Sequence, residues 1–154
     1  MLIRPAIVDD APAISALIHC SLAQLTVDPS GAGAEQFLVH VTPQAIRGYI
    51  ESPNFQYRVA LAEDGLAGVV AVRNGSHLYH LFVQPMRQGQ GLGRQLWTLA
   101  RRELFEAGAQ TLTVNSSANA VPVYAAFGFV VCGKRVDQNG VAFIPMRMCI
   151  APVP

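Results

Sequence analysis

The sequence predicts a mixed α/β domain of the α+β type, in which a largely antiparallel sheet leads into a glycine-rich loop and a helix. The dipeptides Asp64-Gly65, Asn74-Gly75 and Asn139-Gly140 each lie between apolar, alternating runs, and such dipeptides favour tight hairpin turns. The segment 88–94, Gln-Gly-Gln-Gly-Leu-Gly-Arg, ends the meander and opens an amphipathic helical pattern. We therefore expect an antiparallel core with helices packed against it.

Length and composition indicate a single soluble domain. The 154 residues predict one domain over residues 1–154, because single domains commonly have roughly 100 to 200 residues. The chain is 51% hydrophobic and 14% charged, yet no uninterrupted apolar run approaches the roughly 20 residues of a membrane-spanning helix. The formal net charge of +1, without a run of Lys or Arg, argues against a nucleic-acid surface. We therefore expect small-molecule partners, with no membrane and no nucleic acid.

The N-terminal segment and the cysteines bear on location and metal content. Residues 1–10 lack a basic opening and a long apolar stretch, so no export signal is visible and a cytoplasmic location is expected. Cys20, Cys132 and Cys149 lie far apart without paired spacing, which predicts neither a disulfide framework nor a zinc site. The apolar composition is compatible with a homodimer but does not decide it.

Periodicity and capping residues give the expected order of elements. Asp9 or Asp10 can cap the first helix, and Thr42 followed by Pro43 is a good start for the second. Before the glycine loop we expect a strand at 2–8, a helix at 11–25, a loop or weak helix at 26–41, a helix at 43–52, and strands at 56–62, 66–73 and 77–84. After the loop we expect a helix at 91–107, a strand at 111–115, a short helix at 119–127, and a final strand pair at 129–136 and 141–150.

The glycine loop does not fit the two best-known phosphate-binding loops. The dinucleotide fingerprint places Gly-x-Gly-x-x-Gly in an early parallel unit, whereas Gly89, Gly91 and Gly93 alternate after a meander of hairpins. The mononucleotide P-loop needs Gly-Lys-Ser/Thr, but Arg94 and Gln95 follow the last glycine. Neither a nicotinamide nor magnesium is therefore indicated. Accessible main-chain N–H groups and the N-terminus of the following helix instead predict a seat for a pyrophosphate.

Two motifs and the order of elements resemble the GNAT superfamily, which transfers acyl groups from acyl-coenzyme A to amines. The first motif, Gln88-x-x-Gly91-x-Gly93, is similar to the superfamily pattern of Arg or Gln, two residues, Gly, one residue, and Gly or Ala. The second motif, over residues 115–129, is similar to Asn-x-x-Ala-x-x-x-Tyr-x-x-x-Gly-Phe. Four of its positions match in spacing: Ala120, Tyr124, Gly128 and Phe129. One departure is Ser117, which stands where the superfamily usually has Asn and is flanked by Asn115 and Asn119.

The resemblance covers essentially the whole chain and implies a fold and a cosubstrate. The implied fold is GNAT-like, with a largely antiparallel sheet of about six to seven strands, a splay between strands 4 and 5, and about four flanking helices. The implied cosubstrate is acetyl-CoA, with no metal. Arg87 is a candidate for contact with the adenosine 3′-phosphate of the coenzyme. The residues expected to bind the coenzyme are Leu81, Phe82, Val83, Gln88, Gly89, Gln90, Gly91, Leu92, Gly93, Arg94, Asn115 and Ser117.

Acetyl transfer to an amine sets three chemical requirements, and the resemblance implies a candidate for each. The ammonium must lose a proton, the tetrahedral intermediate carries an oxyanion, and the departing thiolate is stabilised by a proton. Tyr124 is expected to be the general acid that protonates the thiolate. A backbone N–H near Leu81 or Phe82 is the candidate for the oxyanion.

The general base has three candidates. His77 stands where several relatives carry a Glu or His that takes the proton of the amine, and a neutral imidazole suits this task. His80 and a chain of waters are the alternatives. In a regular strand Tyr79 would share the face of His77, and His80 would point to the other face. The two histidines are not expected to bind a metal, because no third ligand lies nearby in the sequence.

The function class and the acceptor follow from the same residues. No cysteine lies inside the two motifs, so we expect direct transfer from acetyl-CoA to a primary amine without a covalent enzyme intermediate. The alternative is a non-catalytic acyl-CoA-binding or regulatory module, and the presence of Tyr124 argues against it. Asp28 and Glu35 are candidates to attract a cationic amine. A small amine, an amino acid, an antibiotic and a protein N-terminus or Lys all remain open as acceptors.

Overall fold

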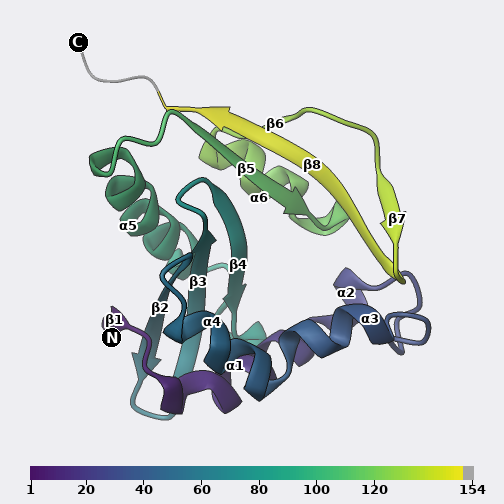
Figure 1. Cartoon of the computed structure of the whole chain (residues 1–154), viewed down its shortest axis with the longest axis horizontal. Helices are drawn as coiled ribbons and strands as arrows, with labels where there is room; N and C mark the ends of the chain where they lie inside the picture. Colours follow the sequence, from purple (N-terminus) through teal and green to yellow (C-terminus); the bar gives the residue numbers. More distant parts are fainter. Residues whose placement is uncertain (151–154) are drawn as a thin grey trace.

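The computed structural model describes residues 1–150, which form a mixed, largely antiparallel sheet with helices on both faces (Figure 1). The strands follow the order β1-β2-β3-β4-β5-β8-β6, with β7 paired to β8. The strands are β1 (Leu2–Pro5), β2 (Phe55–Ala62), β3 (Gly65–Arg73), β4 (His77–Val83), β5 (Thr111–Ser116), β6 (Val130–Val131), β7 (Val136–Gln138) and β8 (Val141–Cys149). The α-helices are α1 (Ala11–His19), α2 (Leu22–Leu25), α3 (Glu35–Leu38), α4 (Pro43–Glu51), α5 (Leu92–Glu106) and α6 (Val121–Phe127). Short 3-10 turns lie at Val8–Asp10, Val39–Val41, Pro85–Arg87 and Ala118–Ala120.

The predicted fold class is confirmed, with two differences in how the elements are divided. The expected helix 11–25 is wrong as a single element, because the chain leaves helical geometry at Ser21 (φ −107°, ψ 8°) and separates α1 from α2. The expected strand 129–136 is wrong as a continuous element, because only Val130–Val131 and Val136–Gln138 pair with β8. The residues in the described part of the chain therefore form eight strands and six α-helices, more than the sequence suggested.

One face of the sheet is covered by α1 and α4. Ile14 and Ile18 of α1 and Ile46 of α4 are fully buried against Val59 and Val69 of β2 and β3. The helix α4 begins as predicted, since the hydroxyl of its N-cap, Thr42, accepts a hydrogen bond from the backbone N–H of Ala45 at 3.1 Å.

The opposite face is covered by α5 and α6. Leu96, Trp97 and Leu104 of α5 pack in a second apolar cluster with Val70 and Val72 of β3. Alternate residues of β3 thus supply the two clusters, as expected for a strand that is buried on both faces. Both layers fix the position of β4, the last strand before the glycine loop.

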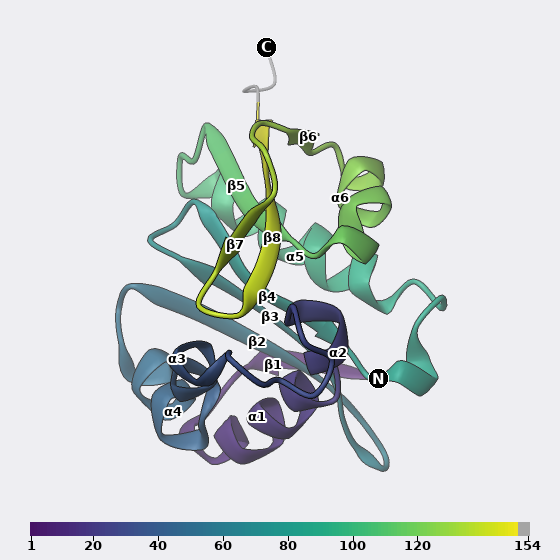
Figure 2. The same ribbon diagram turned by 90° about the vertical axis from the view of Figure 1, so that its right-hand side faces the viewer.

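The sheet opens between its two central strands. β4 and β5 are parallel and pair only at His77 with Thr113 and Leu78 with Val114. Beyond Leu78 the strands diverge (Figure 1), and in the turned view β5, β7 and β8 lie above β1–β4 (Figure 2). The splay that the resemblance implied is therefore present, and it separates β1–β4 from β5, β6 and β8.

A β-bulge interrupts β4 where the strands diverge. Ala71 of β3 lies opposite His80, but its neighbour Val72 lies opposite Leu78, so Tyr79 is the extra residue of β4. The expectation of a regular strand is therefore wrong at this point. Leu78 and Leu81 pack on the α5 side, whereas Tyr79 and Phe82 pack on the α1 and α4 side, and the ring of His80 lies on the ring of Tyr79 with a centroid distance of 4.2 Å.

Candidate functional site

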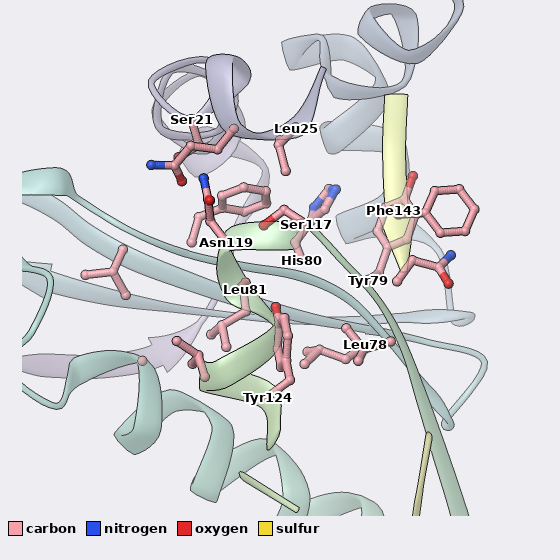
Figure 3. A pocket seen from close by; sticks show the side chains of 18 of the residues that line it. Ser21, Leu25, Leu78, Tyr79, His80, Leu81, Ser117, Asn119, Tyr124 and Phe143 are labelled. Atoms are coloured by element: carbon pink, nitrogen blue, oxygen red, sulfur yellow. The ribbon is translucent and has the colours of Figure 1, made fainter. Parts of the chain in front are cut away.

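A pocket of about 1100 Å³ occupies the splay between β4 and β5. Its floor is formed by β4, and its walls come from both halves of the chain (Figure 3). One part, here named the glycine-loop end, is lined by Val83 and by residues of the loop 88–94. The other part, here named the hairpin end, is lined by residues of α2, α3, the bulge in β4 and the β7–β8 hairpin. The splay thus joins two chemically different regions in one space.

The glycine-loop end is built to receive an anion. Gly89 and Gly91 have φ values of +78° and +86°, in the left-handed region that glycine adopts without a steric penalty. This conformation leads directly into α5, whose first residue is Leu92. The first-turn N–H groups of a helix have no intrahelical partner, and the helix dipole adds positive charge there. An anionic group is therefore stabilised at this end.

Some side chains around the loop hold it in place, and others line the pocket. The Gln88 amide donates to the carbonyl of Val83 at 3.1 Å, which ties the loop to the end of β4. Arg87 forms an ion pair with Asp64 at 2.6 Å, so its guanidinium is engaged with the β2–β3 turn. Arg94 lies over the ring of Phe127 at 5.3 Å and lines the pocket, where it adds positive charge.

Nearly all of the residues expected to bind the coenzyme line this pocket. Gln90 is the exception among them. Those that line it are Leu81, Phe82, Val83, Gln88, Gly89, Gly91, Leu92, Gly93, Arg94, Asn115 and Ser117. The structure therefore brings the end of β4, the glycine loop and the end of β5 together.

Tyr124 reaches the pocket from α6 with a buried ring and an open hydroxyl. Its ring packs edge-on against Phe127 and Phe129, and the residue is 8% exposed. Within residues 1–150 the Tyr124 hydroxyl has no hydrogen-bond partner. It is not buried away from solvent either, so it is accessible from the pocket. In Figure 3 the hydroxyl points from the side of Leu78 and Leu81 toward the upper part of the pocket. Burial raises the pKa of Tyr124 to about 12, so the phenol keeps its proton at neutral pH.

The two histidines of β4 are both at the pocket, in different settings. His77 lines it beside the start of β5, and its Nδ1 lies 2.8 Å from the hydroxyl oxygen of Thr113. His80 lies at the hairpin end, 6% exposed, with its Nδ1 3.1 Å from the hydroxyl oxygen of Tyr57. The bulge turns His80 toward the same side as Tyr79, in contrast to the alternation of a regular strand.

Both histidines are neutral at physiological pH. Burial, followed by the nearby charge of Arg73, lowers the pKa of His77 to about 4. The same causes, with a further contribution from His77, lower the pKa of His80 to about 3. A neutral imidazole has a nitrogen lone pair available to accept a hydrogen bond or a proton. The site therefore offers two acceptors, and neither carries a positive charge.

Several residues of the hairpin end were missed by sequence reasoning. Arg73, Tyr79, Asn139 and Phe143 line the pocket but belong to no motif. Tertiary structure alone brings them together, because they come from β3, β4 and the β7–β8 hairpin. Asn119 also lines the pocket. It was not among the residues expected to bind the coenzyme, although it lies inside the second motif.

The acidic candidates and the cysteines lie outside the pocket lining. Asp28 accepts a hydrogen bond from the backbone N–H of Ser30 at 2.9 Å, and Glu35 accepts one from Gly33 at 3.2 Å. Both carboxylates therefore stabilise their own loop. Within residues 1–150, none of the three cysteines lines the pocket, and no cluster of three His, Cys, Asp or Glu side chains is arranged to hold a metal. No helix in this range is long and apolar enough to cross a membrane.

Comparisons with known proteins agree with this geometry. The aminoalkylphosphonate N-acetyltransferase of Salmonella typhimurium is 31% identical over 74 residues, which are 42% of this chain and 48% of that protein. The match thus spans about half of the relative. A GCN5-related N-acetyltransferase of Rhodopseudomonas palustris shares the fold with a TM-score of 0.79 at 23% identity, over 97% of this chain and 95% of that one.

A second solved structure and a family model complete the comparison. The PaiA N-acetyltransferase of Thermoplasma acidophilum, solved with coenzyme A, shares the fold with a TM-score of 0.73 at 15% identity, over 97% of this chain and 98% of that one. The family model of the acetyltransferase (GNAT) domain matches residues 25–150. Because this match spans most of the chain and the fold agrees, the chain belongs to the GNAT acetyltransferase family.

Proposed function

We propose that this protein transfers the acetyl group of acetyl-CoA directly to a primary amine in the pocket between β4 and β5. One observation carries the proposal: a single pocket joins the anion seat at the start of α5 to the open hydroxyl of Tyr124 and the histidines of β4. A long cosubstrate with a pyrophosphate at one end and a reactive thioester at the other fits such a space.

The glycine-loop end is proposed to hold the coenzyme. The backbone N–H groups of Gly91, Leu92 and Gly93 would bind the pyrophosphate, because the helix start leaves them without intrahelical partners. Arg94 would add a cation at the same place. Beyond Leu78 the side of β4 that faces β5 has no paired strand, so its backbone groups, apart from the Val83 carbonyl that Gln88 holds, would bind the linear arm of the coenzyme. Acetyl-CoA supplies the activated acetyl group when it is bound.

Tyr124 is proposed as the general acid. Its hydroxyl has no protein partner and a raised pKa, so it holds a proton that it can donate to the sulfur as the carbon–sulfur bond breaks. A backbone N–H of Leu81 or Phe82 would donate to the developing oxyanion, because both residues lie on β4 where the strand faces the pocket.

His77 is proposed to accept the proton that the acceptor ammonium must lose. The contact between Nδ1 and Thr113 holds its ring in place. In the tautomer whose Nδ1–H donates to the Thr113 hydroxyl oxygen, Nε2 keeps a free lone pair that can accept the proton. An imidazole whose pKa is about 4 passes the proton on to water instead of retaining it. The amine nitrogen then attacks the thioester carbon and the carbon–sulfur bond breaks, so that its electron pair leaves on sulfur and takes the proton of Tyr124. The second proton of the nitrogen returns to the Tyr124 phenolate, directly or through water, and restores the acid. The alternative proton acceptors are His80 and water. A His77 variant that keeps the native rate would favour one of these alternatives.

The experiment that tests the proposal follows free-thiol release from acetyl-CoA across a panel of primary amines. Tyr124→Phe should bind coenzyme normally but lose roughly 10- to 1000-fold in turnover, the usual contribution of a general acid. Tyr49→Phe is the matched control, because Tyr49 lies in the aromatic cluster beside Tyr79 and outside the pocket lining. Equal turnover by the Tyr124→Phe variant and the native protein would refute the role of the phenol.

The same experiment separates the proposal from a non-catalytic acyl-CoA-binding module. Coenzyme binding without thiol release on any amine would favour the binding module. No coenzyme binding at millimolar concentration would reject both functions. A trapped acetyl-enzyme that is lost in Cys132→Ala would overturn direct transfer, although Cys132 lies outside the pocket lining.

A further inference from the structure

The hairpin end of the pocket has an unusual charge composition. Among the described residues that line the whole pocket, none is Asp or Glu. The hairpin end contains Arg73, His40, His77 and His80 together with the neutral amides of Gln24 and Gln36. A pocket that selects a polycationic amine is expected to present carboxylates to it, because opposite charges stabilise the bound state and like charges oppose it.

Arg73 is the one guanidinium at this end among residues 1–150, and it has no acidic partner there. It ends β3 on the same face as Ala71, the face that carries Tyr79. The guanidinium carbon lies 5.1 Å from the centre of the Tyr79 ring, so the aromatic ring holds the cation at the pocket wall. By contrast, Arg58 and Arg87 are both paired with carboxylates.

The rest of the hairpin end combines apolar side chains with the polar Ser21, Gln138 and Asn139. Leu25, Phe37 and Phe143 line it beside Tyr79, and Figure 3 shows Leu25, Phe143, Tyr79 and His80 around the same space. The loop before α3 crosses this end, since the backbone N–H of Val27 donates to the carbonyl of Gly140 at 2.8 Å. A compact molecule that carries both an apolar part and polar groups therefore fits this end.

We propose that the acceptor is a compact amino acid-like molecule, a primary amine that also carries a carboxylate or phosphonate group, and that Arg73 binds this anionic group. The inference rests on the proposed acetyl transfer and narrows its acceptor. A guanidinium binds either group through paired, charge-assisted hydrogen bonds. Neutralising Arg73 in this way would also remove one of the charges that suppress protonation of His77 and His80, which assists proton removal from the amine.

The test uses three amines with one carbon skeleton: phenylalanine, its phosphonate analogue 1-amino-2-phenylethylphosphonate, and phenethylamine, which lacks the acidic group. Spermidine serves as the polycationic amine. For the native protein we expect kcat/KM to be at least about 10-fold higher for one of the two acids than for phenethylamine or spermidine, in line with a charge-assisted hydrogen bond. Comparison of the two acids identifies which anionic group is preferred. Equal or better use of phenethylamine or spermidine would overturn the proposal.

Variants assign the preference to Arg73. Arg73→Gln should lower the ratio of kcat/KM for the preferred acid to that for phenethylamine about 10- to 100-fold, whereas Arg73→Lys should retain part of the preference. Arg101→Gln is the matched control, because Arg101 is exposed on α5 outside the pocket lining. An equal loss on the acid and on phenethylamine would overturn the role of Arg73.

A binding measurement keeps this inference separate from the proposed function. Calorimetric titration of the same amines into the protein–coenzyme A complex reports recognition without turnover. Coenzyme binding without thiol release would count against acetyl transfer, and tighter binding of an acid than of phenethylamine would still support the anion site. Equal affinities for the acids and phenethylamine would overturn the anion site, whether or not any amine is acetylated.

Discussion

Stability should fall steeply as the pH drops from 7.5 to 5.5, and His80 should account for a measurable part of the loss. The imidazole is 6% exposed, hydrogen-bonds to Tyr57, and has a pKa lowered by burial to about 3. In the unfolded chain an ordinary histidine has a pKa of about 6.5. The unfolded state therefore takes up a proton over this pH range and the folded state does not, so acid favours unfolding.

The size of this contribution follows from the two pKa values. At pH 5.5 the folded imidazole is still neutral, and protonation of the unfolded imidazole stabilises the unfolded chain by about 1.4 kcal/mol relative to pH 7.5. His77 acts in the same direction, but it is only half-buried and its share is smaller. The share of the unfolding free energy that depends on neutral His80 is therefore fully present above about pH 6.5 and is lost progressively as the pH falls below that value.

The assay is urea unfolding of the native protein and of His80→Gln at both pH values. Glutamine offers a polar group to Tyr57 but does not titrate, so the difference in unfolding free energy between pH 7.5 and 5.5 should shrink by about 1.4 kcal/mol. His19→Gln, which removes an exposed imidazole of α1 and leaves the buried pair intact, is the matched control. An unchanged pH dependence in His80→Gln would refute the assignment of a buried, neutral imidazole.

Three further predictions concern the loops and the coenzyme. Gly140→Ala should destabilise the protein by more than Gly75→Ala in urea unfolding. Both glycines have positive φ, which costs an alanine about 1–2 kcal/mol. Only at Gly140 would the new methyl group also collide with the backbone of Gly33. Equal losses would contradict this contact. Gly91→Ala should weaken coenzyme binding in calorimetry by roughly 10-fold. Gly108→Ala, with a similar φ at the other end of α5, is the control and should reduce stability but not affinity. Equal losses of affinity in the two variants would count against an anion site at the start of α5. Coenzyme A at 100 times its dissociation constant should stabilise the fold by about 2.7 kcal/mol, and an unchanged melting temperature at that ratio would show that binding is not linked to folding.

The parts of the fold that depend on local chemistry could be predicted from the sequence. Asn74 and Asn139 both adopt φ of 54° ahead of glycines with positive φ, as the Asn-Gly turns required. Thr42 caps α4, and Pro122 fits because α6 begins at Val121. Each of these features involves residues within a few positions of one another.

The bulge at Tyr79 and the composition of the hairpin end could not be predicted in the same way. The alternation of β4 gives no sign of an extra residue, because the bulge is defined by pairing with Ala71 and Val72 of β3. Arg73 and Phe143 meet across the pocket although 70 positions separate them in the sequence. Their meeting depends on how the β7–β8 hairpin is placed over β4, and such long-range packing has no local signature.

The two-residue pairing between β4 and β5 leaves an interruption in the middle of the sheet. Past Leu78 and Val114, backbone groups of both strands face the gap without a partner strand. Their other sides pair with β3, apart from the bulge at Tyr79, and with β8. Proteins normally shield such edges, since they invite pairing with another chain. The amide groups of the bound cosubstrate would form hydrogen bonds with these backbone groups and cover the edge. With the proposed binding mode, the coenzyme-free state is the one that leaves this edge uncovered, so bound coenzyme would also protect the protein from misassociation.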